Sequence, residues 1–309
     1  MRPYDTFTAF IKVWNEIYKI LTRRDPVVKI FGRFMDIKLG NSDNQLIQAL
    51  TERWLPTTHT FIFPCAEIVI TPLDFTMLTS LPIGKYPTQL SYDDRQSVIS
   101  EAMKLLPRIT SNNTKSGNVI IAYLKKYLTV TDDRSNDSTV ARAFILFMMR
   151  HLWFQTANNT IPLRYLEAMA DLGEAPSYDW GFSILASLYY GLDTAVTTGG
   201  VITGFSQLLE YCGVGHPIVN NALKMTLHPR LKAWEKGNWK KTNNQVGSLF
   251  TIASYLIDHQ TIESINWRPW DISVDLELDY VHIAITLSRM RMPLKVLNGN
   301  FEYYLGDRC

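Results

Sequence analysis

The fold class follows from residues 180–192, which read WGFSILASLYYGL. Apolar side chains recur here at the spacing that places them on one face of a helix. The same periodicity marks other segments along the chain. These are Phe7–Leu21, Ser138–Met148, Leu163–Leu172, Phe205–Tyr211, Val246–Ile257 and Leu278–Met290. We therefore predict a mainly α protein built from many amphipathic helices.

Strand composition is confined to short stretches. Residues 58–63 (THTFIF) and 67–71 (EIVIT) are rich in β-branched and aromatic side chains, with a proline-containing turn between them. They predict a small β-hairpin near residues 58–71. Pro72 then opens a helix, because proline is favoured in the first helical turn. A second hairpin around Asn298-Gly299 is one interpretation of the C-terminal segment, and a helix ending at the glycine is the other.

Domain organisation is predicted from the continuity of the apolar pattern. Candidate loops lie at Leu81–Ser91, Ser111–Gly117 and Thr131–Ser138. Apolar periodicity continues on both sides of each loop, which favours one large domain over two separable ones. We expect a single domain over residues 1–309, with a helical N-terminal extension at about 1–40 and a core at about 41–309.

Composition excludes several classes of protein. The 309 residues are 46% hydrophobic and 19% charged, a globular balance. The formal net charge of +2 gives no general reason to expect polyanion binding. Cys65, Cys212 and Cys309 are odd in number and widely spaced, which favours a reducing compartment over a disulfide scaffold. The apolar run Ala143–Met149 is too short to span a bilayer, so we expect no membrane helix.

A search for catalytic and metal-binding patterns leads to an expectation of no enzyme, cofactor or metal. His59 and Cys65, with Cys212 and His216, are the nearest approach to a zinc set. If residues 59–65 form one strand, however, a six-residue offset at ~3.3 Å per residue separates the two side chains by roughly 20 Å. Zinc needs its ligands within about 2.3 Å of one point. A buried thiol is the better interpretation of Cys65.

Charge is distributed more informatively than its total suggests. Residues 224–241 contain six cationic side chains and one acidic side chain, Glu235, which gives a local charge of +5. The residues of this candidate patch for a nucleic acid or an acidic partner are Lys224, Arg230, Lys232, Trp234, Lys236, Trp239, Lys240 and Lys241. Residues 263–279 carry −4. The alternative is a solvated face, or neutralisation of one segment by the other.

An ordered string of motifs resembles a known family. The motifs are LIQALTERW (46–54), THTF (58–61), EIVITPLDF (67–75), ARAFIL (141–146), YDWGFSILASLY (178–189) and INWRPW (265–270). In this order they resemble the plant mobile domain, also labelled the aminotransferase-like plant mobile domain. We expect the motif residues to be structural. They are Trp54, His59, Thr60, Phe61, Glu67, Arg142, Arg164, Trp180 and Trp267.

The motif residues also suggest specific contacts. Trp54 and Phe61 are expected to fill the core, and His59 and Thr60 to hydrogen-bond where the first strand meets the preceding helix. Buried arginines need carboxylate partners. For Arg142 and Arg164, the candidates are Glu67, Asp171 and Asp179.

The resemblance implies a cellular role but no particular chemical reaction. The family occurs in plant transposable elements and in host proteins derived from them. It implies a non-enzymatic scaffold in a nuclear complex that acts in transposon silencing, gene expression and genome integrity, with a protein-phosphatase-like partner of the serine/threonine class. An enzyme of unknown class is the alternative of lowest weight. The aminotransferase label would require a lysine that forms a Schiff base with pyridoxal phosphate, and no lysine here has that setting.

Overall fold

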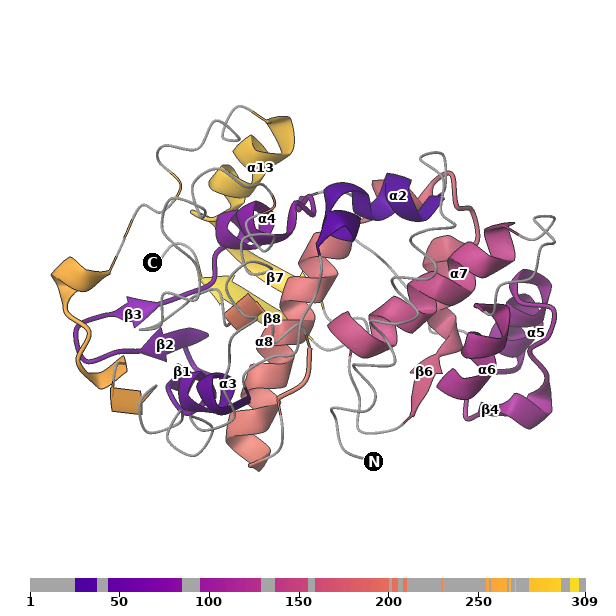
Figure 1. The fold of residues 1–309 in the computed structure, drawn as a ribbon, viewed down its shortest axis with the longest axis horizontal. Helices are drawn as coiled ribbons and strands as arrows, with labels where there is room; N and C mark the ends of the chain where they lie inside the picture. The colour runs from indigo at the N-terminus through magenta and orange to yellow at the C-terminus, as the bar shows by residue number, and fades with distance from the viewer. Residues whose placement is uncertain are drawn as a thin grey trace, which may run out of the picture. The chain divides into compact units, whose positions relative to one another are not determined.

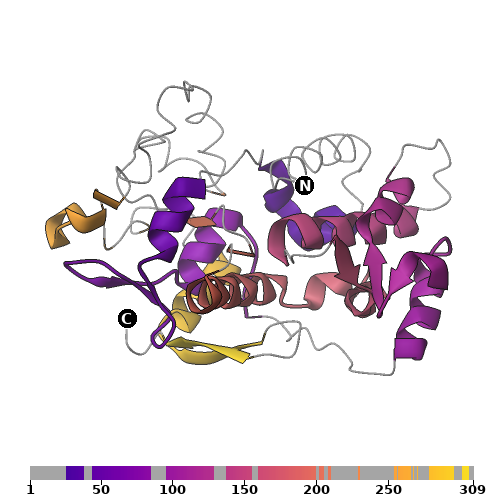
Figure 2. The same cartoon turned by 90° about the horizontal axis from the view of Figure 1, so that it is seen from below.

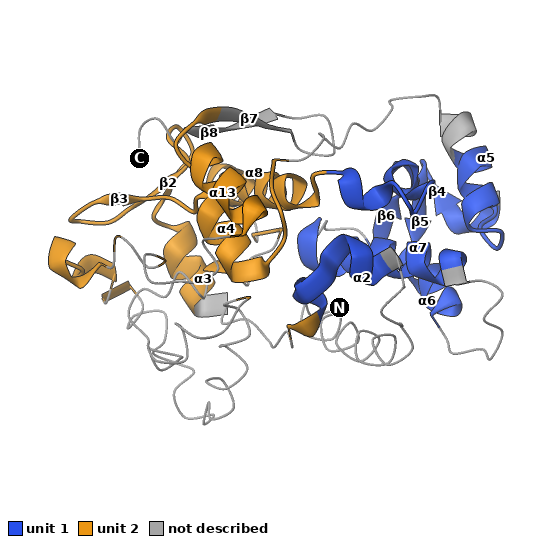
Figure 3. Ribbon diagram, turned by 90° about the horizontal axis from the view of Figure 1, so that it is seen from above, with its two compact units in different colours: residues 1–35, 85–178 blue, residues 36–84, 179–309 orange. Residues whose placement is uncertain are grey.

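The computed structural model describes most of the chain up to residue 199 and parts of the rest. The described residues are 26–37, 44–84, 95–128, 137–154, 159–199, 202–204, 208–209, 229, 254–255, 257–265, 267, 270, 278–295 and 301–305. They group into two compact units (Figure 3). Unit 1 comprises residues 1–35 and 85–178, and unit 2 comprises residues 36–84 and 179–309. The single domain expected from the sequence stays a prediction.

Helices dominate both units, so the mainly α prediction is confirmed (Figure 1). The strands form small antiparallel sheets. Within the described part of the chain, no helix combines the length and hydropathy that a membrane crossing requires. The predicted helix Phe7–Leu21 lies outside the described residues, and so does most of Phe205–Tyr211.

Unit 1 is built around helix α7 (Asp137–Met148) and the π-helical turn η4 (Met149–Trp153). Its other elements are α2 (Pro26–Phe31), η1 (Gly32–Asp36), α5 (Arg95–Leu105), η2 (Ser111–Asn113), β4 (Thr114–Lys115), β5 (Asn118–Ile120), α6 (Ile121–Tyr127), β6 (Thr160–Pro162), η5 (Leu163–Met169) and η6 (Ala175–Ser177). The indole of Trp153 packs against Phe31 and Phe34, with ring centroids 4.8 and 5.6 Å apart. These fully buried rings form much of the unit 1 core.

A three-stranded sheet in unit 1 contradicts the expected loop at Ser111–Gly117. Strand β4 pairs with β5, and β5 pairs with β6. Ser116 and Gly117 connect β4 to β5, with φ angles of 51° and 76°. Two successive positive φ angles are the mark of a type I′ turn, whose twist matches that of the flanking strands. A loop-like composition therefore forms a tight hairpin.

Unit 2 is organised around helix α8 (Trp180–Thr198). Its other elements are α3 (Asn44–Thr51), β1 (Trp54–Leu55), β2 (Thr60–Ile62), β3 (Glu67–Ile68), α4 (Pro72–Thr79), η10 (Ile262–Ser264), α13 (Asp279–Leu287), β7 (Arg291–Lys295) and β8 (Phe301–Leu305). Helices α3 and α4, strand β1 and the β7–β8 hairpin all contact α8. Figure 2 shows that hairpin running beside the helix. Burial on several sides explains why residues 180–192 are almost continuously apolar.

Both ends of α8 have identifiable causes. The Asp179 carboxylate accepts a hydrogen bond from the Phe182 N–H at 2.9 Å and caps the N-terminus. Gly199 ends the helix with a φ of 67°, a left-handed conformation that glycine adopts without steric cost. Within the helix, a Cβ at Gly191 would collide with the Thr203 carbonyl oxygen. The glycine thus lets a second chain segment lie directly on the helix backbone.

The predicted hairpin near residues 58–71 is confirmed and extended by one strand. Strand β2 pairs with β3, and β1 adds to the other edge with Trp54 opposite Phe61. Helix α4 begins at Pro72, as predicted. A capping box holds its start, because the Asp74 N–H donates to Thr71 Oγ1 and the Thr71 N–H donates to Asp74 Oδ2.

The C-terminal segment also forms a hairpin. Strand β7 pairs with β8 over five residue pairs, from Arg291–Leu305 to Lys295–Phe301. This pairing supports the hairpin interpretation over the alternative helix. The Asn298-Gly299 turn itself lies outside the described residues.

Candidate functional site

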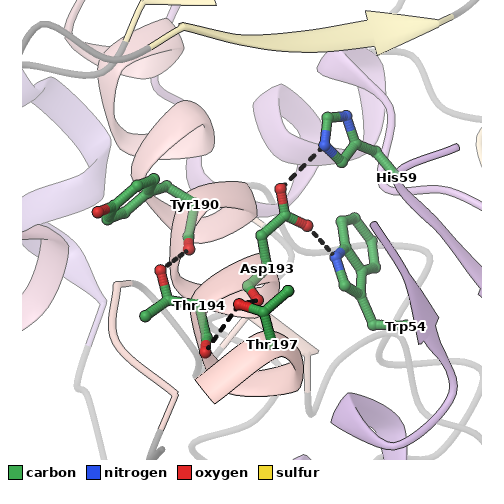
Figure 4. Close-up of polar contacts among 6 residues, drawn as sticks. All are labelled: Trp54, His59, Tyr190, Asp193, Thr194 and Thr197. Atoms are coloured by element: carbon green, nitrogen blue, oxygen red, sulfur yellow. Dashed lines mark hydrogen bonds and ion pairs between the residues drawn. The ribbon is translucent and has the colours of Figure 1, made fainter. Parts of the chain in front are cut away.

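A polar cluster joins the β1–β2 connection to the middle of α8 in unit 2 (Figure 4). Asp193 accepts a hydrogen bond from Trp54 Nε1 at 2.6 Å, and its second carboxylate oxygen lies 3.0 Å from His59 Nε2. Because the carboxylate accepts, the Nε2–H of His59 is the donor. The side chains of His59 and Asp193 are only 10% and 18% exposed. We call Trp54, His59, Tyr189 and Asp193 the Asp193 cluster.

Aromatic packing surrounds these hydrogen bonds. The Trp54 ring lies 5.9 Å from that of His59 and 5.2 Å from that of Tyr189, between centroids. The Phe61 ring meets Trp54 edge-on at 4.9 Å. Tyr189 is fully buried, and its hydroxyl donates to the Ile70 carbonyl at 2.8 Å. Trp54 and Phe61, expected in the core, are each 3% exposed.

The backbone at His59 adopts a conformation that a non-glycine residue rarely takes. Its φ angle is 57°, in the left-handed region. Its N–H donates to the Leu55 carbonyl at 2.8 Å and closes a turn between β1 and β2. That turn aims the imidazole at α8, so a locally strained residue makes a contact with a helix 134 positions further along the chain.

The actual partners of His59 and Thr60 differ from the expected ones. The expectation placed them against the helix before the strand, which is α3. Instead His59 bonds to Asp193 of α8. Thr60 Oγ1 lies 2.7 Å from Thr58 Oγ1 and donates to Glu67 Oε2 at 3.0 Å. Glu67, on strand β3, therefore pairs with its neighbouring strand.

Arg142 binds main-chain carbonyls in unit 1. Its Nε donates to the Met169 carbonyl and its Nη2 to the Ala170 carbonyl, both at 2.9 Å. Burial lowers the pKa of Arg142, and the nearby charge of Asp171 acts in the opposite direction. The arginine thus stabilises the C-terminal end of η5, where carbonyl groups lack helical partners. Of the three expected carboxylates, Asp171 is the one that interacts with it.

The remaining motif residues have local partners. The Arg164 guanidinium lies 5.9 Å from the centroid of the Tyr165 ring. Trp180 is buried in the first turn of α8. The buried Asp179 that caps this helix also accepts a hydrogen bond from the Gly84 N–H at 2.6 Å.

Asp74 is a polar residue that the sequence analysis did not single out. Trp270 Nε1 donates to Asp74 Oδ1 at 2.8 Å, and Thr71 supplies the capping-box hydrogen bonds. Burial raises the pKa of Asp74, against the lowering effect of these bonds. The sequence analysis did not identify the Asp193 cluster either. Asp193 is the lone charged residue of α8, and a single charge in a long apolar helix is a signal that could have indicated it.

Trp267 differs from the other aromatic motif residues, Trp54, Phe61 and Trp180, because it is exposed. Its side chain is 52% exposed, and its Nε1 donates to the Ile262 carbonyl at 3.0 Å. Ile262 and Tyr255 nearby in the chain are 56% and 58% exposed. An ion pair of 2.5 Å between Asp258 and Arg53 ties this segment to the end of α3. We call Tyr255, Ile262 and Trp267 the Trp267 surface.

The predicted basic patch belongs to a part of the chain that the structure does not describe. Lys224, Arg230, Lys232, Trp234, Lys236, Trp239, Lys240 and Lys241 all lie outside the described residues. Cys212 and His216 of the rejected zinc set do so too, while Cys65 is a half-buried free thiol in the turn between β2 and β3. In the described ranges, no three histidine, cysteine or acidic side chains converge as a metal site would need.

Comparison with known proteins places the chain. The plant mobile domain family model matches residues 31–309. The chain is 28% identical to "Protein MAIN-LIKE 2" of Arabidopsis thaliana, over 90% of this chain and 43% of that protein. It is 24% identical to "Protein MAINTENANCE OF MERISTEMS" of the same plant, over 90% of this chain and 59% of that protein.

A further match covers part of the chain. A "Serine/threonine-protein phosphatase 7 long form homolog" of Arabidopsis thaliana is 30% identical over 48% of this chain and 11% of that protein. The chain spans about half the length of the first two relatives. No solved structure matches. The family model covers nearly all of the described structure, and the chain therefore belongs to the plant mobile domain family.

Proposed function

We propose that this chain is a non-enzymatic protein-interaction module. It would serve as a scaffold in a nuclear complex that acts in transposon silencing, gene expression and genome integrity. Family membership supports this role. The structural observation that carries it is the contrast between the buried aromatic motif residues and Trp267, which is half exposed.

The Trp267 surface has the properties of a protein-binding site. Tryptophan and tyrosine are the side chains most enriched among residues that dominate binding energy. Large apolar side chains exposed on a surface often mark interaction sites, and Trp267 and Ile262 are joined by a hydrogen bond. The Arg53–Asp258 ion pair and the Trp267–Ile262 hydrogen bond hold the backbone that presents them. A pre-ordered surface loses less conformational entropy when a partner binds.

The proposed partner is a protein-phosphatase-like protein of the serine/threonine class. The support is the matching relative, whose name includes a serine/threonine phosphatase and which contains a stretch similar to 48% of this chain. A domain that occurs within such a protein is a reasonable binding partner for one.

Calorimetric titration of the purified full chain with that Arabidopsis phosphatase homologue tests the proposal. Trp267→Ala should weaken binding about tenfold or more, as for a residue central to an interface. Val196→Ala is the matched control, because Val196 is a 40% exposed apolar residue on α8. Absence of binding by the unchanged chain would refute the proposal. Equal weakening by both variants would refute the assignment of the surface.

Nucleic-acid binding through residues 224–241 is the second candidate function. The local charge of +5 and the interleaved Trp234 and Trp239 favour it. Neutralising Lys232, Lys240 and Lys241 should make the salt dependence of binding less steep, because each phosphate contact releases counterions. Binding that does not vary with salt would exclude this function.

A further inference from the structure

A second concentration of positive charge lies within the described residues, in unit 1. From Arg95 to Leu128 the chain carries six cations and one acid, Glu101. Glu101 lies 2.5 Å from Lys104, so that acid already has a cationic partner. The local charge of +5 equals that of residues 224–241.

Arg108, Lys125 and Lys126 come together at the C-terminal end of α6. The Arg108 N–H donates to the Tyr127 hydroxyl at 2.8 Å, which holds the turn after α5 against the helix. The Arg108 guanidinium lies 5.8 Å from the centroid of the same ring. All three cationic residues are exposed. We call them the α6 cationic face.

Aromatic rings lie among these cations. The Lys126 ammonium lies 4.5 Å from the centroid of the half-buried Tyr123 ring, and the Lys125 ammonium lies 6.0 Å from that of Phe147. The last turn of a helix also favours cations, because the helix dipole is negative there. Positive charge thus lies beside a half-buried aromatic ring.

We propose that the α6 cationic face binds the phosphate backbone of a single-stranded nucleic acid, with the Tyr123 ring stacking on a base. Sequence-tolerant binding of single strands combines a cationic track for phosphates with aromatic platforms for bases. An acidic peptide would use the cations and leave the ring without a role. This site is made of other residues than the Trp267 surface and the segment 224–241, so its test does not depend on the proposed function.

Fluorescence anisotropy with the full chain and a labelled oligothymidine tests the proposal across a salt series. The triple variant R108Q/K125Q/K126Q should make the slope of log affinity against log salt shallower by about 2, at about 0.7 per lost phosphate contact. Over a fourfold rise in salt, the unchanged chain should lose roughly 20-fold more affinity than the variant. The control K29Q/R33Q removes two exposed cations from α2 and η1 and should keep the original slope.

Tyr123 variants test the stacking contact separately. Tyr123→Leu should weaken binding about fivefold or more without a change in salt slope, while Tyr123→Phe should bind like the unchanged chain. Several results would overturn the inference. They are no binding by the unchanged chain, an effect of the triple variant no larger than the control's, loss only in a K232Q/K240Q/K241Q variant, and stronger competition by duplex DNA or polyglutamate than by single strands.

Discussion

His151 should make the stability of the chain depend on pH. The side chain lies in the π-helical turn η4 and is 7% exposed. Its Nδ1–H donates to the Phe147 carbonyl at 2.8 Å. The pKa of His151 is lowered from 6.5 to about 4, mainly by burial, while the hydrogen bond to Phe147 opposes this shift and the charges of Arg150 and Lys125 add to it. The folded protein therefore holds this imidazole neutral.

The sign and size of the effect follow from the two pKa values. Between them, the unfolded chain binds more protons than the folded one, so stability falls as pH falls. The stabilising contribution is complete above about pH 6.5 and is lost as pH approaches 4. With about 1.36 kcal/mol per unit of pKa, the loss between pH 7 and pH 5 is about 2 kcal/mol.

Urea unfolding at pH 7 and pH 5 measures this loss directly. His151→Gln keeps an N–H donor for the Phe147 carbonyl but does not titrate. The unchanged chain should lose about 2 kcal/mol more than this variant between the two pH values. His259→Gln is the control, because His259 is exposed and its removal should leave the pH dependence intact. An equal loss in the unchanged chain and His151→Gln would refute a neutral, buried His151.

Substitutions at three positions in unit 2 should lower the free energy of unfolding, measured by urea titration at pH 7. Asp193→Ala should cost about 3 kcal/mol, because Trp54 Nε1 and His59 Nε2 lose their acceptor, and Asp193→Asn, which keeps one acceptor oxygen, should cost less; equal losses would contradict this account. Gly191→Ala should cost more than about 1 kcal/mol, because the added Cβ would collide with the Thr203 carbonyl. This cost should exceed the benefit from the higher helix propensity of alanine, and a gain in stability would show that the collision is relieved by a small shift. Thr71→Val should cost about 1 kcal/mol through loss of the capping box, and an unchanged midpoint would mean that Pro72 alone sets the helix start.

Elements with a strong local cause were predictable from the sequence. Helix α8 follows from its apolar run and α4 from Pro72. The hairpin β2–β3 follows from its β-branched residues. Each has a signal within a few residues that no tertiary contact needs to supply.

Elements defined by pairing were not predictable. Strands β4, β5 and β6 are two or three residues long, too short for any alternation to register. The turn between β4 and β5 uses Ser116 and Gly117, a pair whose composition also fits an open loop. The third strand of the sheet, β6, comes some forty residues after β5 in the chain, so the sheet can be recognised only from the pairing of these two strands.

The candidate site shows the same limit in its chemistry. Charge pairing predicted carboxylates for Arg142, but an arginine offers several donors and can satisfy main-chain carbonyls instead. Which acceptor it reaches depends on where η5 ends, and no spacing in the sequence records that. His59 likewise hydrogen-bonds to Asp193 on α8, 134 positions further along the chain, and its own backbone is left-handed, which no local spacing indicates.

Several motif residues hydrogen-bond to one another inside the fold, which explains why the motifs do not indicate a chemical reaction. Trp54 and His59, from the first two motifs, hydrogen-bond to Asp193, the lone charged residue of α8. The N-terminal part of α8 is the motif YDWGFSILASLY. Two distant parts of the chain are thus joined by one carboxylate, and their polar groups act on each other. Trp267 comes from the last motif and is half exposed, and its indole N–H donates to the Ile262 carbonyl. An exposed side chain contacts either solvent or a partner. A tryptophan that contacts solvent gains no free energy from the burial of its apolar surface, whereas one that a partner covers does. For this reason Trp267 is the motif residue at which a loss of binding should occur without a loss of fold.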